Sequence, residues 1–120
     1  MIVTLTKEYR FEAAHRLPLV PAGHKCARVH GHSYRINLEV RGPIDPDTGW
    51  LIDYGVIDDA WAPLHLRFDH HMLNDIAGLE NSTSENLAVY IWHALHGQIA
   101  HLSAVTVAET HDSTCTYRGP

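Results

Sequence analysis

Residues 30–41 read His30-Gly31-His32-Ser33-Tyr34-Arg35-Ile36-Asn37-Leu38-Glu39-Val40-Arg41 and alternate in polarity with a period of two. The even positions carry the two histidines and then aromatic or aliphatic side chains, whereas charged and amide side chains dominate the odd positions. This alternation is typical of a β-strand with one buried face. Side chains two residues apart on a strand share a face, so we predict that His30 and His32 project in the same direction.

Residues 2–15 show the same alternation and end with His15 on the apolar side of the predicted strand. If the two strands pair antiparallel, His15 meets His30 and His32 at one end of the sheet. Gly31 would let a ligand or another backbone segment approach closely. Three neutral imidazoles suit Zn²⁺ and leave its fourth position open, which is typical of a catalytic rather than a structural zinc site.

Other interpretations of these residues remain open at this point. The chain has eleven histidines, and a histidine on an apolar face often serves only as a hydrogen-bonded core residue. Cys26 lies four residues before His30, so it could close the metal site as a fourth ligand. Its thiolate could instead act as a general base or nucleophile, or the thiol could pack as a small apolar group.

Two helices are predicted in the middle of the chain. Asp53 is a predicted N-cap, and apolar residues recur at helical spacing over residues 56–64, although Pro63 weakens this helix. Ser82-Thr83-Ser84-Glu85 matches a capping box, with Glu85 as the partner of Ser82. An amphipathic helix over residues 86–100 is expected to follow it.

Two further strands are predicted near the end of the chain. Residues 103–110 and 114–117 are rich in β-branched side chains and flank a turn at residues 112–113. The resulting order, β-β-α-α-β-β, predicts an α+β fold with an antiparallel sheet of four strands. The edges of such a sheet must be covered, which favours a homo-oligomer.

Length and composition restrict the class of protein. With 120 residues and 45% hydrophobic content, we expect one globular domain over residues 1–120. The formal net charge is −5 and no Lys/Arg cluster occurs, so we expect no nucleic-acid partner. No apolar run approaches the length of a membrane span, and no signal-peptide pattern occurs. The two cysteines are too few for a disulfide scaffold, which favours a reducing cytoplasm.

Three acidic or imidazole residues outside the first strands are further candidates. Asp69 and His70 form an acid–imidazole pair suited to proton relay, but they could equally be a solvated helix end, and His71 could compete for the role. Glu109 lies on the apolar face of a predicted strand, where a carboxylate needs a partner. That partner could be the N–H edge of a ligand or the guanidinium of Arg118.

The order of these motifs resembles the 6-pyruvoyl-tetrahydropterin synthase family, and within it the 6-carboxy-tetrahydropterin synthase branch of queuosine biosynthesis. The resemblance extends along nearly the whole chain. Two features of this chain resemble those of the carboxy branch: the gap of three residues between Cys26 and His30, and the segment Thr48-Gly49-Trp50. The motifs that carry it are Phe11-Glu12-Ala13-Ala14-His15-Arg16-Leu17-Pro18, Gly23-His24-Lys25-Cys26, His30-Gly31-His32-Ser33, Asp45-Pro46-Asp47-Thr48-Gly49-Trp50 with Asp53, Asp69-His70-His71-Met72-Leu73-Asn74-Asp75, Thr83-Ser84-Glu85-Asn86, Glu109-Thr110 and Tyr117-Arg118-Gly119.

The resemblance implies the tunnelling fold, a four-stranded antiparallel sheet with two helices on one face. Members assemble oligomeric barrels, usually trimers that pair into hexamers, with active sites at the interfaces. It also implies a role for each candidate: His15, His30 and His32 as Zn²⁺ ligands, Cys26 as the base, Asp69 and His70 as the relay, Glu109 as the pterin anchor, and Thr83 and Glu85 as lining of the pterin pocket.

The activity implied is that of a zinc-dependent lyase. Its substrate would be 7,8-dihydroneopterin triphosphate, and its products 6-carboxy-5,6,7,8-tetrahydropterin, acetaldehyde and triphosphate. One alternative is the 6-pyruvoyl-tetrahydropterin synthase activity, which retains the carbon chain of the same substrate. Another is a zinc-binding scaffold without activity, in which Cys26 closes a site of four ligands.

Overall fold

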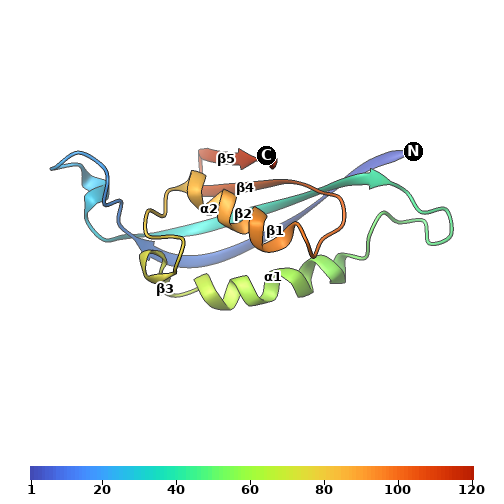
Figure 1. The fold of residues 1–120 in the computed structure, drawn as a ribbon, viewed down its shortest axis with the longest axis horizontal. Coiled ribbons are helices and arrows are strands. Elements are labelled where there is room, and N and C mark those ends of the chain that lie inside the picture. The colour runs from blue at the N-terminus through green and yellow to red at the C-terminus, as the bar shows by residue number, and fades with distance from the viewer.

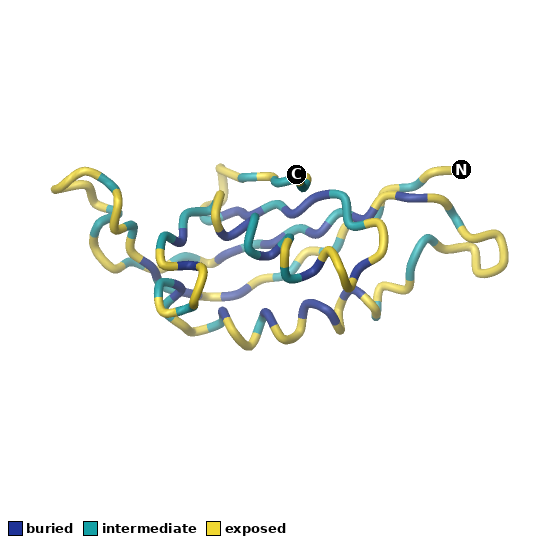
Figure 2. Tube along the Cα trace, viewed as in Figure 1, coloured by how far each residue is buried: buried dark blue, intermediate teal, exposed yellow.

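Two long strands, β1 (Ile2–His15) and β2 (His30–Pro43), form the centre of the computed structural model, which describes residues 1–120. They pair antiparallel along their whole length, from Ile2 opposite Pro43 to His15 opposite His30. Burial alternates along both strands, so that the predicted apolar positions face the core (Figure 2). Both predicted strands are confirmed.

The sheet continues on both sides of this pair. β4 (Leu102–Thr110) pairs antiparallel with β2, and β5 (Ser113–Tyr117) pairs antiparallel with β4. β3 (His71–Met72) pairs parallel with Ala13 and Ala14 of β1, which gives the order β3-β1-β2-β4-β5 (Figure 1). The four predicted antiparallel strands are present, but the sheet has five strands, because a strand of two residues carries no readable periodicity.

Both helices pack on one face of the sheet (Figure 1). α1 (Tyr54–Phe68) contributes Ile57, Trp61, Leu64 and Phe68 to the core, and α2 (Ser84–Leu95) contributes Leu87, Ala88, Ile91 and Leu95. These side chains meet the buried face of the strands, which carries Phe11, Tyr34, Ile36, Leu38, Val105 and Val107. The arrangement is the α+β fold that the sequence predicts.

Side-chain caps fix where the helices begin. Asp53 caps α1 as predicted, accepting a hydrogen bond from the Gly55 N–H at 2.9 Å. The capping-box prediction for α2 is wrong: Thr83 is the N-cap and accepts from the Asn86 N–H at 3.1 Å. Ser82 is buried beside His15 and is therefore not available to cap the helix. α2 ends at Leu95, before the predicted residue 100, because the N–H groups of residues 98 and 99 turn back to the Leu95 carbonyl.

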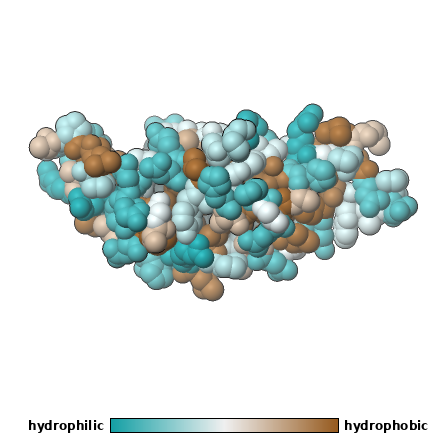
Figure 3. All heavy atoms as spheres, viewed as in Figure 1, coloured by the Kyte–Doolittle hydropathy of each residue, from teal (hydrophilic) through white to brown (hydrophobic).

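The molecule is elongated, with principal extents of 57 × 25 × 23 Å. The loop of residues 16–29 projects from one end and that of residues 44–53 from the other (Figure 1). Brown, hydrophobic residues lie exposed at both ends of the molecule (Figure 3). Leu19 in the first loop and Trp50 in the second are among the exposed large side chains. Neither helix combines the length and the apolar character needed to cross a membrane.

Candidate metal centre and active site

The pairing of β1 with β2 brings three histidines together at one end of the sheet. His15 lies opposite His30, and His32 lies opposite Ala13 on the same face. The imidazole centroids are 4.6 to 5.1 Å apart. One nitrogen from each ring lies within 4.8 Å of the others. The predicted juxtaposition of the three imidazoles is confirmed.

Backbone carbonyls fix the orientation of two of these rings. The Nδ1–H of His15 donates to the Ser82 carbonyl at 2.8 Å, and that of His30 donates to the Arg28 carbonyl at 2.8 Å. A carbonyl can only accept, so Nδ1 of each ring carries the proton and Nε2 keeps its lone pair. Metal-ligating histidines are commonly oriented in this way.

Two ring nitrogens at the centre of the cluster have no partner. The Nε2 atoms of His15 and His32 are buried and make no hydrogen bond within the chain. Buried polar atoms without a partner are rare in folded proteins, so each one requires an explanation. A metal ion between the three rings would satisfy both nitrogens, and three imidazoles are a suitable donor set for Zn²⁺. The residues present therefore fit the metal that the resemblance implies.

Burial favours the neutral form of two of the three imidazoles, those of His15 and His32. It lowers the pKa of His15 below its usual value; the Ser82 hydrogen bond and Glu109 oppose this shift, whereas the neighbouring histidines add to it. Burial also lowers the pKa of His32, against the opposing charge of Glu109. Because only the neutral ring can bind a metal, both ligands are ready for metal at neutral pH.

Glu109 extends from β4 to the edge of the three-histidine cluster. Its Oε1 lies 3.9 Å from the Nε2 of His15, and its side chain is 25% exposed. The alternative partner considered for it, Arg118, is instead paired with Glu39 at 2.9 Å. The carboxylate of Glu109 is thus free to accept hydrogen bonds from a ligand beside the three-histidine cluster.

Cys26 lies in a short 3-10 turn, Lys25–Ala27, on the loop between β1 and β2. Its carbonyl accepts from the Leu17 N–H at 2.7 Å, and its own N–H donates to His24 Nδ1 at 3.0 Å. The half-buried thiol is not a member of the three-histidine group. The arrangement gives no support to a site of four protein ligands closed by Cys26.

Asp69 and His70 lie at the outer edge of β1, where α1 ends. Asp69 accepts from the Glu12 N–H at 2.9 Å with one oxygen and contacts the His70 Nδ1 at 2.8 Å with the other. The Glu12 N–H, and after it His70, hold the pKa of Asp69 below its usual value. His71 instead contacts the Asp69 carbonyl at 2.9 Å, so the carboxylate orients His70 rather than His71.

The His70 backbone has a φ of 59°, which is unusual for a residue with a side chain. Its N–H donates to the Glu12 carbonyl at 2.6 Å, and the imidazole is 77% exposed. The ring is therefore held at its Nδ1 by a carboxylate while the rest of it faces solvent. A histidine held in this way can exchange protons with a molecule bound at the surface of the chain.

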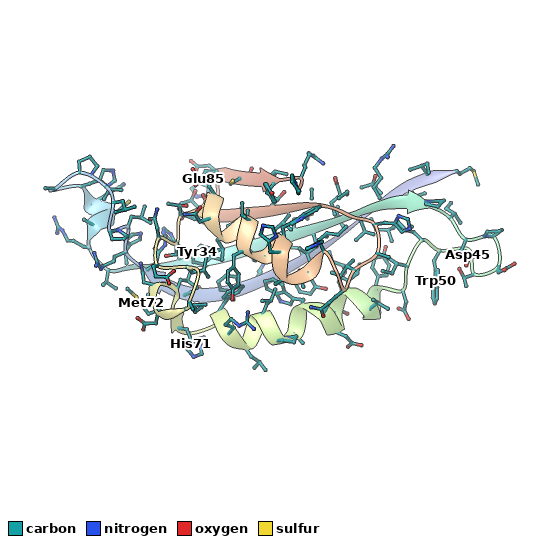
Figure 4. The ribbon with its side chains drawn as sticks, in the orientation of Figure 1. Tyr34, Asp45, Trp50, His71, Met72 and Glu85 are labelled. Atoms are coloured by element: carbon teal, nitrogen blue, oxygen red, sulfur yellow. The ribbon has the colours of Figure 1, made fainter.

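An open groove of about 510 Å³ is lined by residues from both parts of the candidate site, with His32 from the histidine cluster and His70 from the pair with Asp69. Figure 4 places His71 and Met72 at the groove end of the molecule, far from Asp45 and Trp50 at the opposite end. Thr83 and Glu85 do not line the groove: Thr83 caps α2, and Glu85 accepts from the Ser84 hydroxyl at 3.0 Å. The groove is lined by Glu12, Ala13, Ala14, Gly31, His32, Ser33, His70, His71 and Met72.

Two residues of the site were not expected from the sequence. Ser82 acts through its carbonyl, and a backbone group leaves no signal in the choice of side chain. Tyr34 is fully buried, with its hydroxyl 3.3 Å from the His15 Nδ1 (Figure 4). Its even position, two residues after His32 on the same strand face, is a signal that could have identified it.

We expect the metal-free protein to lose stability as pH falls from about 7 to about 5.5. The pKa values of His15 and His32 are lower in the folded chain than in the unfolded chain, so the unfolded chain binds protons first. The associated stability is complete above the unfolded-state pKa and decreases as pH falls below it. Urea unfolding midpoints at the two pH values measure the effect.

His15→Asn should weaken this pH dependence, because it removes one of the two imidazoles whose pKa is lowered in the folded chain. His93→Asn, on the exposed face of α2, should leave it as in the wild type. Equal midpoints for the wild type at both pH values would contradict the prediction.

Comparison with known proteins agrees with the fold. The family described as 6-pyruvoyl tetrahydropterin synthase matches residues 4–120. The 6-carboxy-5,6,7,8-tetrahydropterin synthase of Synechocystis sp. is 39% identical over 122 residues, covering 95% of this chain and 92% of that protein. The 6-pyruvoyl tetrahydrobiopterin synthase of Drosophila melanogaster is 36% identical over 136 residues, covering 99% and 81%.

A solved structure shares the whole architecture. The 6-pyruvoyl tetrahydropterin synthase of Caenorhabditis elegans superposes with a TM-score of 0.92 at 32% identity, covering 100% of this chain and 97% of that one. The family match, the identity to these relatives and the structural agreement each extend over nearly the full sequence. This chain belongs to the 6-pyruvoyl tetrahydropterin synthase family.

Proposed function

We propose that this protein is a zinc-dependent 6-carboxy-5,6,7,8-tetrahydropterin synthase that converts 7,8-dihydroneopterin triphosphate into 6-carboxytetrahydropterin, acetaldehyde and triphosphate. The observation that carries the proposal is the group of three imidazoles with two buried, unpartnered Nε2 atoms beside a free carboxylate. The relative in Synechocystis bears the name of this activity. The short gap between Cys26 and His30 resembles the spacing in the same carboxy branch.

His15, His30 and His32 would hold the zinc ion through their Nε2 atoms. Zinc in this position would supply positive charge that stabilises negative charge developing on the substrate side chain. The two Nδ1–H groups bound to carbonyls keep the His15 and His30 rings in the orientation that zinc requires. Burial of His15 excludes water from the side of the cluster that faces the core.

Cys26 is proposed as the base that removes a proton from the substrate side chain. A thiolate is a competent general base, and the loop that carries Cys26 leads directly into His30. Cys26 is half-buried and is not one of the three grouped imidazoles, which is consistent with contact to substrate instead of metal. This role separates the proposal from a zinc-storing scaffold, in which the thiol would have to bind zinc.

Asp69 and His70 are proposed as the proton relay. The carboxylate holds His70 Nδ1, which leaves Nε2 to give or take a proton. Because His70 lies exposed at the outer edge of β1, we propose that it serves an active site shared with a second copy of the chain. β3 covers only Ala13 and Ala14 of this edge, so much of β1 is open for pairing.

Glu109 is proposed to anchor the pterin. A carboxylate can accept two parallel hydrogen bonds from an amino group and a ring N–H. Its position next to His15 would set the distance between the pterin ring and the metal, which is a positioning role. Thr83 and Glu85 are proposed to line the pocket in the assembled protein, where Glu85 is exposed at the start of α2 (Figure 4).

The assembly is proposed to be a trimer of open sheets that closes into a barrel and pairs into a hexamer. We place it in the cytoplasm, in queuosine or other 7-deazaguanine biosynthesis. The two free thiols, Cys26 and Cys115, are consistent with a reducing compartment.

The second candidate activity is that of a 6-pyruvoyl-tetrahydropterin synthase. The relative in Drosophila bears the name of the pyruvoyl activity at nearly the same identity as the relative in Synechocystis. Both activities use the same substrate and the same three-histidine metal site. Release of acetaldehyde distinguishes them, because only the carboxy activity cleaves the side chain.

The deciding experiment incubates the zinc-loaded protein with 7,8-dihydroneopterin triphosphate, followed by mass analysis of the pterin and an assay for acetaldehyde. Carboxypterin with acetaldehyde is the expected result. A pyruvoyl product without acetaldehyde would assign the second activity, and no turnover despite bound zinc would refute both.

Cys26→Ala should abolish turnover while zinc content stays at the wild-type level, because the thiol acts on substrate and not on metal. Elemental analysis and the acetaldehyde assay measure the two quantities. Cys115→Ala, which changes a half-buried thiol on β5, is the matched control and should keep most of its activity. Loss of zinc from Cys26→Ala would overturn the base assignment.

Glu109→Gln should weaken pterin binding by about 10-fold or more while zinc affinity changes little, because the substitution replaces a charged acceptor by a neutral amide. Titration of a pterin ligand against the zinc-loaded protein measures the effect. Glu39→Gln is the control, since Glu39 is occupied by Ser103 and Arg118. Equal pterin affinity in Glu109→Gln and the wild type would refute the anchor role.

Active sites shared between copies predict complementation. Co-assembly of Cys26→Ala with His70→Ala subunits should restore about a quarter of wild-type activity in a ring with heterologous interfaces, although each variant alone is inactive. If one chain supplied both groups, every site in the mixture would lack one of them. Mixed oligomers without activity would therefore contradict the shared site, and size measurement by light scattering reports the oligomer count.

A further inference from the structure

Residues 80–82 form a segment whose carbonyl groups are all held by side chains from elsewhere in the chain. The three hydrogen bonds are 2.8 to 2.9 Å long. They run from Asn74 Nδ2 to the Glu80 carbonyl, from Asn86 Nδ2 to the Asn81 carbonyl, and from His15 Nδ1 to the Ser82 carbonyl. The last of these donors is a ligand of the candidate metal centre, so the position of the segment bears directly on the metal site.

Asn74 uses its whole amide to join this segment to the end of β1. Its Oδ1 accepts from the Arg16 N–H at 2.9 Å, and its Nδ2 donates to the Arg16 carbonyl at 2.8 Å and to the Glu80 carbonyl. Arg16 directly follows His15. The Asn74 side chain therefore sets the spacing between the backbone at His15 and residues 80–82, the segment that orients the His15 ring. Only an amide offers an acceptor and two donors in this geometry.

Asn86 holds the same segment from the side of α2. Its Nδ2 reaches back to the Asn81 carbonyl, while its N–H is bound by the Thr83 cap. Ser82 between them is 1% exposed, and its hydroxyl lies 3.4 Å from the His15 Nδ1. The Ser82 carbonyl accepts the hydrogen bond from His15. Its segment is therefore held from the side of β1 by Asn74 and from the side of α2 by Asn86, and Ser82 is enclosed by the core.

We propose that Asn74 and Asn86 are positioning residues for His15. By holding residues 80–82 they keep the Ser82 carbonyl on Nδ1, which fixes the tautomer and directs Nε2 toward the metal. The inference rests on the zinc site of the proposed function. Groups that orient a metal ligand in this way commonly change metal affinity by about 10- to 100-fold when removed.

Asn74→Asp tests the proposal with almost no change in size. It replaces the two-proton donor by an oxygen, which would face the carbonyls of Arg16 and Glu80. The matched control is Asn81→Asp, the same chemical change in the same segment at a side chain that makes no hydrogen bond. Zinc affinity is measured by competition with a chelator, and the visible spectrum of the Co²⁺-loaded protein reports the ligand geometry.

The expected result is zinc affinity weakened by about 10-fold or more in Asn74→Asp, with a changed Co²⁺ spectrum, and by less than about 2-fold in Asn81→Asp. The thermal midpoint of each metal-free variant is measured separately, because a purely structural role would lower the midpoint without altering the Co²⁺ spectrum of the folded fraction. If Asn74→Asp does not fold, Asn86→Asp is compared with Asn81→Asp by the same measurements.

Equal zinc affinity and an equal spectrum in the variant and its control would overturn the positioning role while leaving the zinc site intact. Failure of both Asn74→Asp and Asn86→Asp to fold would also overturn it, because the amides would then serve the fold as a whole. Absence of zinc binding by the wild type would instead refute the proposed function on which the inference rests.

Discussion

The register between β1 and β2 is the constraint on which the rest of the structure depends. Their pairing continues without a bulge from Ile2 opposite Pro43 to His15 opposite His30. Because side chains alternate between faces, a slip of one residue would send His30 and His32 to the solvent face and leave His15 alone in the core. The same register aligns the apolar positions that both helices cover, so the histidine cluster and the core are specified by a single pairing.

The elements with strong periodicity could be predicted from the sequence. The two long strands, their buried faces and the meeting of the three histidines all follow from a period of two and one antiparallel pairing. The relation of Asp69 to His70 followed from adjacency alone, but its attachment to Glu12 did not, because that contact joins residues 57 positions apart. β3 was missed since two residues carry no pattern.

The wrong helix cap and the open alternative for Glu109 share a physical cause, which is competition between partners that are distant in sequence. Ser82 has the local chemistry of a helix cap, yet it is buried against His15 and leaves the cap to Thr83. Arg118 was one of two partners considered for Glu109, but it pairs with Glu39 of β2 instead. Backbone acceptors such as the Ser82 carbonyl are beyond sequence reasoning, because every residue has one.

His15 and His30 donate to backbone carbonyls, and this affects the charge of the candidate metal centre. A carbonyl is neutral, so a divalent ion bound there would keep most of its positive charge, whereas a carboxylate partner would offset part of it. The nearest anion is Glu109, 3.9 Å from the His15 Nε2. Under the proposed anchor role of Glu109, hydrogen bonds from a pterin edge would reduce the influence of this anion on the rings, and the occupied site would be more electrophilic than the empty one.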